Sequence, residues 1–428
     1  MKGDTIVMQN KMNQFIKIEE GNKVALVDPI GKVCLGVSKK LADNLEMPEV
    51  QEKLYPVWKQ QVEFIEKVES AHEAINTVYL MVTRKCNMDC DFCAINANNK
   101  MLLDKEFKLE DIRDKVVPFF KENKPHKLII TGGEPLIKAQ IIEIVKCLHD
   151  NLNCPITLQS NGLSITPQII EQLSGHIDEI DFSTKHMFET PRKEQELIRH
   201  IQLCQKAGIK ILLSFIYDKE NEEDLYKLID IAAKYDTDVL FNIVSSVGRA
   251  KEDYAILTDM EHIDMNLKIV KYILKKGYIN KRICEGFNHR IQVRNSCGGY
   301  GKVMAIFPEG DIYMCQCMEC PQVRIGNILS DTSQCILENL KKLLKTESIK
   351  AMFCVSHKKI CKDCDYRYIC GGKCAATEDT YDYRCIFLKA MLNYTLFHYD
   401  YRKGIRENLE EYIIYMEHIK RTEMEKSS

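Results

Sequence analysis

A run of alternating strand and helix patterns, from about residue 76 to residue 245, constrains the fold more than any other feature of the sequence. Six short runs have the β-branched and aliphatic composition of strands, and amphipathic stretches of helical period follow them. Most of the runs are mainly apolar and do not alternate strictly with polar residues, which is typical of parallel strands covered by helices. The expected strands are INTVYLMVT, KLIIT, PITLQS, IDEIDFS, KILLSFIY and DVLFNIV. The pattern predicts an α/β domain whose parallel sheet is either open or curled into a partial barrel.

Unusual residues follow five of these six strands. In both forms of the sheet, ligands bind at the carboxyl ends of the strands. The segments at those ends are TRKCNMDCDFC, TGGEP, SNG, STK and SSVGR. Because the carboxyl ends of parallel strands meet at one rim, we expect a single site there.

Other segments flank this core, and we divide the chain into four parts. Residues 1–75 predict a small α+β module with a strand hairpin and an amphipathic helix. Residues 76–277 form the α/β core, and residues 278–390 are loop-like and dense in cysteine. Residues 391–428 predict a helical tail.

The cysteine content indicates the chemistry. The chain has 19 cysteines and begins without the apolar run of a secretion signal. In a reducing cytoplasm, such cysteines are better explained as metal ligands than as disulfides. Lys+Arg 60 against Asp+Glu 62 gives a net charge of -2, so no basic field recruits nucleic acid. No apolar stretch is long enough to cross a membrane, and we expect a cytoplasmic protein.

Three cysteines, Cys86, Cys90 and Cys93, form a C-x3-C-x2-C loop after the first strand. A cubane [4Fe-4S] cluster with three thiolate ligands keeps one iron open to another ligand. A structural zinc site usually has four protein ligands in paired C-x2-C halves, which this loop lacks. The spacing therefore favours an iron-sulfur cluster over zinc.

With Phe92 before its last cysteine, this loop resembles the signature of the radical SAM superfamily. The resemblance implies a partial (β/α)6 barrel in which S-adenosylmethionine binds the open iron of a [4Fe-4S] cluster. Transfer of an electron from the cluster then cleaves S-adenosylmethionine and gives a 5′-deoxyadenosyl radical. By the same resemblance, the residues expected to contact S-adenosylmethionine are Gly132, Gly133, Glu134, Ser160, Asn161, Ser183 and Arg192.

Gly248, Arg249 and Ala250 resemble a GRA motif found after the sixth strand. Where many relatives have Leu-Asp-Gly after the fourth strand, this chain has Thr184, Lys185 and His186.

The second group of cysteines resembles the SPASM domain of peptide-modifying radical SAM enzymes; a zinc ribbon is the alternative. The resemblance implies two auxiliary [4Fe-4S] clusters. The outer cluster would be held by Cys361, Cys364, Cys370 and Cys385. The inner cluster would be held by Cys297, Cys315 and Cys374, with Cys284 as first candidate for the fourth ligand. The other options are Cys317, Cys320 or an open iron.

Relatives with this layout crosslink ribosomally made peptides by thioether or carbon-carbon bonds. We therefore predict a peptide maturase that receives electrons from a protein such as flavodoxin or ferredoxin. Residues 1–75 would bind the precursor's leader as an added strand. One alternative is an anaerobic sulfatase-maturating enzyme, although Gln316 stands where those relatives have an aspartate base. Another is a non-enzymatic zinc or iron-sulfur redox scaffold. The sequence nominates no catalytic residue.

Overall fold

The computed structural model of the chain describes residues 15–70, 75–101, 106–218, 220–250, 256–287, 290–377 and 384–427. Its centre is a nine-stranded sheet in the order β12-β11-β10-β4-β5-β6-β7-β8-β9. Six neighbouring strands of this sheet are parallel and follow the chain order. They are β4 (Thr77–Met81), β5 (Lys127–Thr131), β6 (Ile156–Ser160), β7 (Glu179–Ser183), β8 (Lys210–Tyr217) and β9 (Asp238–Ile243). All six predicted strands are therefore confirmed.

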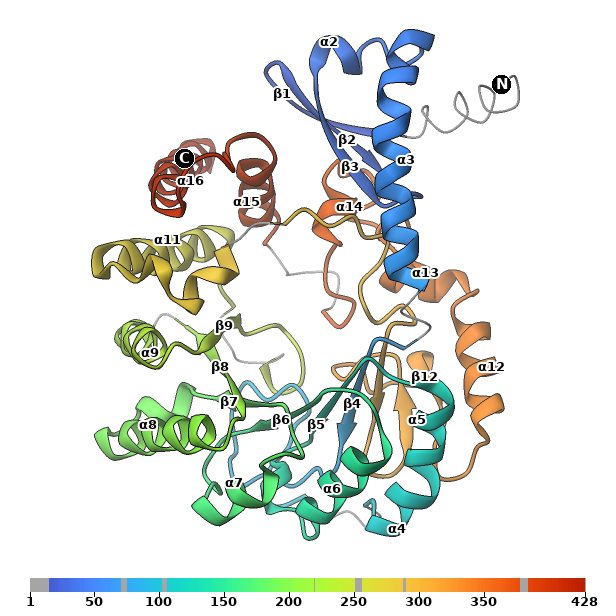
Figure 1. The fold of residues 1–428 in the computed structure, drawn as a ribbon, viewed down its shortest axis with the longest axis vertical. Helices are drawn as coiled ribbons and strands as arrows, with labels where there is room; N and C mark the ends of the chain where they lie inside the picture. Colours follow the sequence, from blue (N-terminus) through green and yellow to red (C-terminus); the bar gives the residue numbers. More distant parts are fainter. Residues whose placement is uncertain are drawn as a thin grey trace.

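Helices from the connections between the parallel strands cover one side of the sheet in an arc (Figure 1). Their apolar faces pack against the strands in one large core, which includes Ile144, Val145 and Leu148 of α6. The covering helices are α4 (Leu109–Asp111), the π-helix η1 (Ile112–Val116), α5 (Val117–Asn123), α6 (Ile141–Asn151), α7 (Pro167–Leu173), α8 (Pro191–Lys206), α9 (Glu222–Tyr235) and α11 (Asp259–Lys276). Short helical turns are η2 (Pro135–Ile137), η3 (Lys185–Phe188), η4 (Tyr278–Asn280), η5 (Arg282–Phe287) and η6 (Pro321–Val323). The predicted α/β fold is confirmed.

The cysteine-rich region is more regular than its sequence indicates. Its strands β10 (Val303–Ile306), β11 (Asp311–Tyr313) and β12 (Arg324–Asn327) extend the central sheet, because β10 pairs parallel with β4. The region also contains α12 (Ser333–Leu343), α13 (Glu347–Phe353) and α14 (Arg367–Cys370). The prediction of a loop-like segment was wrong here, because strands of three or four residues carry little periodic signal. The second cysteine region is thus fixed to the first strand of the core.

The amino-terminal module has the predicted hairpin and helix. It comprises β1 (Ile16–Glu20), β2 (Lys23–Asp28), β3 (Val33–Ser38), α2 (Lys39–Ala42) and α3 (Pro48–Ser70). The three strands are antiparallel in the order β1-β2-β3, and α3 packs across one face. The indole N–H of Trp58 donates to Oδ2 of the buried Asp28 at 2.7 Å, which ties α3 to the end of β2.

Two helices end the chain, α15 (Cys385–Phe397) and α16 (Ile405–Ser427), and both pack against α11. The predicted boundary at residue 391 falls inside α15, because the helix already begins at Cys385. Among the described helices, none is long and apolar enough to span a membrane.

Candidate functional site

The three cysteines of the first loop line one cavity at the carboxyl ends of the parallel strands. The cavity has a volume of about 1080 Å³ and is lined by Cys86, Cys90 and Cys93. The backbone N–H of Cys86 donates to the carbonyl of Asn98, and that of Cys93 to the carbonyl of Cys90. The loop is therefore folded back on itself, with its thiols on the rim where the sequence predicts the site.

The two glycines after β5 hold the backbone that leads into this loop. Gly133 N–H donates to the carbonyl of Thr83 at 2.8 Å, and Glu134 N–H to that of Lys85 at 2.9 Å. A Cβ on Gly133 would lie 2.1 Å from the carbonyl oxygen of Lys85, so no larger residue fits. Gly132 and Gly133 both line the cavity. These contacts explain why the glycines are required there.

Glu134 has a different position from the one expected for a cofactor contact. Its side chain is fully buried and is absent from the lining of the cavity. Oε1 accepts hydrogen bonds from the Leu136 N–H and the Ser160 hydroxyl, and Oε2 accepts one from the Asn161 N–H at 2.7 Å. With three donors in place, Glu134 ties the end of β6 to the turn after β5.

Asn161 connects the end of β6 to the cysteine loop. Its side-chain Nδ2 donates to Oδ1 of Asn87 at 2.7 Å and lies 3.9 Å from Sγ of Cys86. Ser160 and Asn161 both line the cavity, as predicted.

Arg249 is a site residue that the sequence analysis did not select, although the GRA motif was visible. Its guanidinium donates to the carbonyl oxygens of Cys90 at 2.6 Å and Ala97 at 2.9 Å, and to the Asp89 carboxylate at 2.6 Å. Next to it, Gly248 has φ +59, and an added Cβ would lie 2.2 Å from the carbonyl of Cys93. The segment after β9 therefore clamps the cysteine loop.

The structure brings Ser183 to the cavity but not Arg192. Ser183 ends β7 and lines the cavity. Arg192 lies in the first turn of α8, where its side chain is 89% exposed and pairs with Glu196 one turn later. Lys185 lines the cavity instead, with Nζ 4.8 Å from the ring centre of Phe92. The expectation for Arg192 is thus not met, because the start of α8 faces solvent.

The structure brings Cys370 close to Cys361 and Cys364, and Cys385 close to Cys370 and Cys361. Burial raises the pKa of Cys370, and the neighbouring Cys361 and Cys364 raise it further. Burial also raises the pKa of Cys385, with further contributions from Asp259, Cys370 and Cys361. These thiols come from the loop before α14, from the last residue of α14 and from the first residue of α15.

The structure brings Cys317, and not Cys284, next to Cys315 of the inner group. Cys315 and Cys374 both lie near Cys297. A hydrogen bond between the thiols of Cys315 and Cys317 raises the pKa of Cys315 and lowers that of Cys317. Cys284 is elsewhere: its buried thiol donates to the carbonyl of Tyr278 at 3.2 Å. The 3-10 turn η5 places the side chain of Cys284 in the apolar core, and its role as a cluster ligand stays a prediction.

The two cysteine regions meet at Gln316. This residue lines the cavity of the first cysteine loop and also a neighbouring cavity of about 900 Å³. The neighbouring cavity is lined by Cys317, Cys361 and Cys374 among others. Burial raises the pKa of Tyr79 on β4, and the nearby side chain of Gln316 lowers it.

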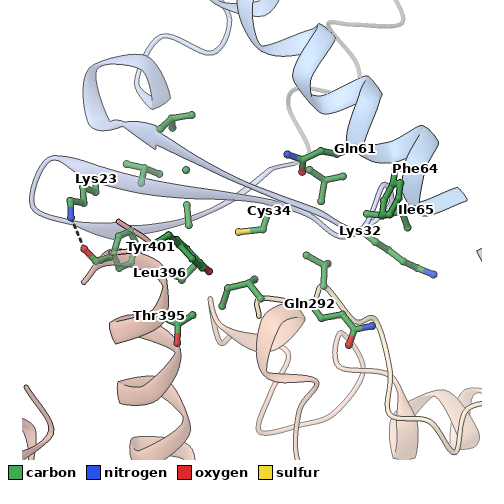
Figure 2. Close-up of a pocket in the computed structure, with 18 of the residues that line it drawn as sticks. Lys23, Lys32, Cys34, Gln61, Phe64, Ile65, Gln292, Thr395, Leu396 and Tyr401 are labelled. Carbon is green, nitrogen blue, oxygen red and sulfur yellow. Dashed lines mark hydrogen bonds between the residues drawn. The ribbon is translucent and has the colours of Figure 1, made fainter. Parts of the chain in front are cut away.

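A third cavity, of about 810 Å³, lies beside the amino-terminal module (Figure 2). It runs along β3 between α3 and the end of α15, and its wall includes Phe64, Leu396 and Tyr401. In the part of the chain that the structure describes, β3 pairs only with β2. Lys23 closes one end by donating to the carbonyl of Phe397. The groove therefore joins a free strand edge to an apolar wall.

Three thiols on a carboxyl-terminal rim, in front of a roomy cavity, are a suitable ligand set for an iron-sulfur cluster with an open iron in an α/β fold. The family model described as the radical SAM superfamily matches residues 80–232. Residues 80–232 are therefore a radical SAM domain, and enzymes of this superfamily use a [4Fe-4S] cluster and S-adenosylmethionine as cofactors.

Three known proteins illustrate the similarity. GTP 3′,8-cyclase of Clostridium perfringens is 23% identical over 261 residues, which cover 59% of this chain and 77% of the cyclase. Mycofactocin maturase MftC of Mycobacterium tuberculosis is 22% identical over 339 residues, covering 73% of this chain and 82% of the maturase. The crystal structure of Streptococcus suis SuiB bound to precursor peptide SuiA matches with TM-score 0.55 and 14% identity, over 85% of this chain and 94% of SuiB.

The residues present fit the cofactors of this superfamily. Cys86, Cys90 and Cys93 supply thiolate ligands of the kind that iron-sulfur clusters require. Burial raises the pKa of Cys90 to about 11, so binding of iron must displace its proton. When bound, the cluster and S-adenosylmethionine supply a carbon radical that removes a hydrogen atom from substrate.

Proposed function

We propose that this radical SAM enzyme matures a ribosomally made precursor peptide by installing an intramolecular thioether or carbon-carbon crosslink. The observation that carries the proposal is that Gln316 lines both the cavity of the first cysteine loop and the cavity at Cys317 and Cys374. Crosslinking after hydrogen-atom removal requires an acceptor for one more electron. Iron-sulfur clusters in the second region would provide it next to the radical site.

The cofactor ligands follow from the contacts described above. The radical cluster would use Cys86, Cys90 and Cys93, and S-adenosylmethionine would lie against Gly132, Gly133, Ser160, Asn161 and Ser183. The outer auxiliary cluster would use Cys361, Cys364, Cys370 and Cys385, and the inner one Cys297, Cys315, Cys374 and Cys317. A small electron-transfer protein such as flavodoxin or ferredoxin would reduce the radical cluster.

Two similarities support a peptide as the substrate. The SuiB structure named above contains a precursor peptide, and MftC is named a maturase. The MftC match also extends over more of this chain than the match to the GTP cyclase, 73% against 59%.

The groove along β3 is the proposed binding site for the leader of the precursor. An extended peptide can add to a free strand edge through backbone hydrogen bonds, while neighbouring pockets take its side chains. Phe64 of α3 lines the groove although its side chain is 67% exposed. An exposed aromatic side chain beside an open strand edge is a suitable contact for an apolar leader residue.

A matched pair of variants tests the groove. Phe64→Asp puts a charge into it, and we expect at least tenfold weaker binding of the leader because a carboxylate there loses solvation. Val57→Asp is the control, since Val57 is also exposed on α3, at 48%, but does not line the groove. Fluorescence polarisation with a labelled leader, taken from the short reading frame beside this gene, measures both. Equal affinities of the two variants would exclude the groove as the leader site.

The activity itself is tested with anaerobically reconstituted enzyme, S-adenosylmethionine, dithionite and the same precursor. We expect 5′-deoxyadenosine by HPLC and a peptide that is lighter by two hydrogens in mass spectrometry. The variant with Cys86, Cys90 and Cys93 all changed to Ala should form neither product while retaining auxiliary iron. An enzyme that forms 5′-deoxyadenosine but leaves every adjacent short peptide unchanged would contradict the maturase proposal.

A further inference from the structure

Polar side chains line the floor of the cavity behind the first cysteine loop. They come from neighbouring parallel strands and are Tyr79, Gln159, Asp181, Ser214 and Asn242. On β7 the side chains alternate, so Ile180 and Phe182 enter the apolar core whereas Asp181 faces the cavity. A carboxylic acid is thus placed at the floor of a site where substrate must enter.

One oxygen of this carboxylic acid has no well-aligned hydrogen-bond donor among the described residues, although the nearby Ser214 hydroxyl lowers the pKa of the acid. Asp181 is only 7% exposed, and its Oδ2 accepts a hydrogen bond from Nε2 of Gln159 at 3.0 Å. Its Oδ1 is buried and makes no hydrogen bond to the described residues. A buried acceptor without a donor costs free energy, which an occupant of the cavity can recover by supplying a donor.

The buried acid Glu134 differs from Asp181 in how its carboxylate oxygens are hydrogen-bonded. Both oxygens of Glu134 are occupied by donors from Leu136, Ser160 and Asn161, and the side chain is outside the cavity. Glu134 therefore holds the fold, whereas Asp181 keeps an oxygen available on the cavity side. Burial raises the pKa of Asp181, against the opposing effect of Ser214 and Gln159. A raised pKa makes its carboxylate a stronger base.

The surroundings of Asp181 point toward the second cysteine region. Burial raises the pKa of Tyr79, and Cys317, Cys315 and Asp181 raise it further. Tyr79, Asp181 and Gln316 line the same cavity, and Gln316 also lines the neighbouring cavity with Cys317 and Cys374. A proton acceptor and an electron acceptor are then close to each other, as an oxidative bond closure requires.

We propose that Asp181 contacts the peptide at the cavity floor and accepts the proton that is released when the crosslink closes. This inference rests on the proposed function. The substrate carbon radical forms a bond to a sulfur or carbon atom of a neighbouring side chain, and the bond from that atom to hydrogen breaks. The proton moves to Oδ1 of Asp181, and the remaining electron moves to an iron-sulfur cluster of the second cysteine region. Asp181 is therefore a catalytic residue rather than a structural one.

The test compares wild type with Asp181→Asn and Asp181→Glu, each as reconstituted holoenzyme in D2O with dithionite and the precursor peptide. For Asp181→Asn we expect S-adenosylmethionine affinity and 5′-deoxyadenosine formation within about twofold of wild type, and crosslinked peptide reduced ~10²–10⁴-fold. The stalled carbon radical is reduced by dithionite and takes a deuteron from solvent, so deuterium appears in peptide that is not crosslinked. Asp181→Glu restores part of the crosslinking, and the decline of wild-type crosslinking at low pH is absent from Asp181→Asn.

Two results would overturn the role of Asp181 alone while wild type still crosslinks. One is normal crosslinking by Asp181→Asn. The other is a parallel loss of S-adenosylmethionine binding and 5′-deoxyadenosine, which would assign Asp181 to cofactor binding or to the fold. If wild type cleaves S-adenosylmethionine and crosslinks no peptide, the proposed function fails and this inference fails with it.

Discussion

The two cysteine regions hold their thiols in different ways. In the first, three cysteines lie within eight residues, and other strand ends fix the loop through Gly133, Asn161 and Arg249. In the second, thiols far apart in the sequence meet because short strands and helices bring them together. The first region is thus a local motif held by outside supports, whereas the second is itself a product of the tertiary fold. In the first region, substitution of the residues that hold the loop should therefore disturb the cluster. In the second region, substitution of the cysteines themselves should do so.

The largest effect on a support is expected at Gly248. Gly248→Ala places a Cβ 2.2 Å from the backbone oxygen of Cys93, so the cysteine loop must shift. A displacement of about 1 Å at a reacting centre can cost ~10²-fold in rate, and we expect at least that loss in 5′-deoxyadenosine formation. HPLC of the product and iron analysis measure the effect.

Gly208→Ala is the matched control for Gly248→Ala. Gly208 also has a positive φ, of +73, but nothing lies within 4 Å of an added Cβ. It should cost only ~1–2 kcal/mol of stability, from the left-handed backbone, and leave turnover unchanged. Similar losses of turnover in both variants would show that backbone strain, and not contact with Cys93, causes the defect.

In the second region, a smaller change is expected from removing one inner ligand. Cys317→Ala, made with Cys86, Cys90 and Cys93 also changed to Ala, should alter the EPR signal of the auxiliary iron and speed its loss to a chelator about tenfold or more. Cys284→Ala in the same background should have no effect, because its thiol is bonded to the carbonyl of Tyr278. The reverse pattern would restore Cys284 as the fourth ligand.

The same contrast explains what the sequence could predict. Periodicity located all six parallel strands, and spacing located Cys86, Cys90 and Cys93, because both are local signals. The pairing of β10 with β4 joins segments more than 200 residues apart, and neither periodicity nor residue spacing indicates it. The exposed position of Arg192 and the core position of Cys284 could not be predicted for a similar reason: the direction of a side chain depends on how its helix or turn packs. In the sequence, Asp181 is one of several acidic residues in a predicted strand. Only the fold shows that its side chain is buried.

The smallest expected effect concerns the clamp on the first loop. Arg249→Ala removes three hydrogen bonds to the loop, each contributing ~1 kcal/mol. Because Gly133 and Asn161 still hold the loop, we expect only part of this loss in the rate of iron release, which should rise roughly tenfold under a chelator. Arg249→Lys should recover part of the effect because one charged donor remains. Arg192→Ala is the matched control, since its exposed guanidinium pairs only with Glu196 among the described residues. It should change S-adenosylmethionine affinity less than twofold in equilibrium dialysis. A larger loss of affinity in Arg192→Ala than in Arg249→Ala would mean that the start of α8 moves onto the cofactor, and that the first region depends on a closure as well as on its supports.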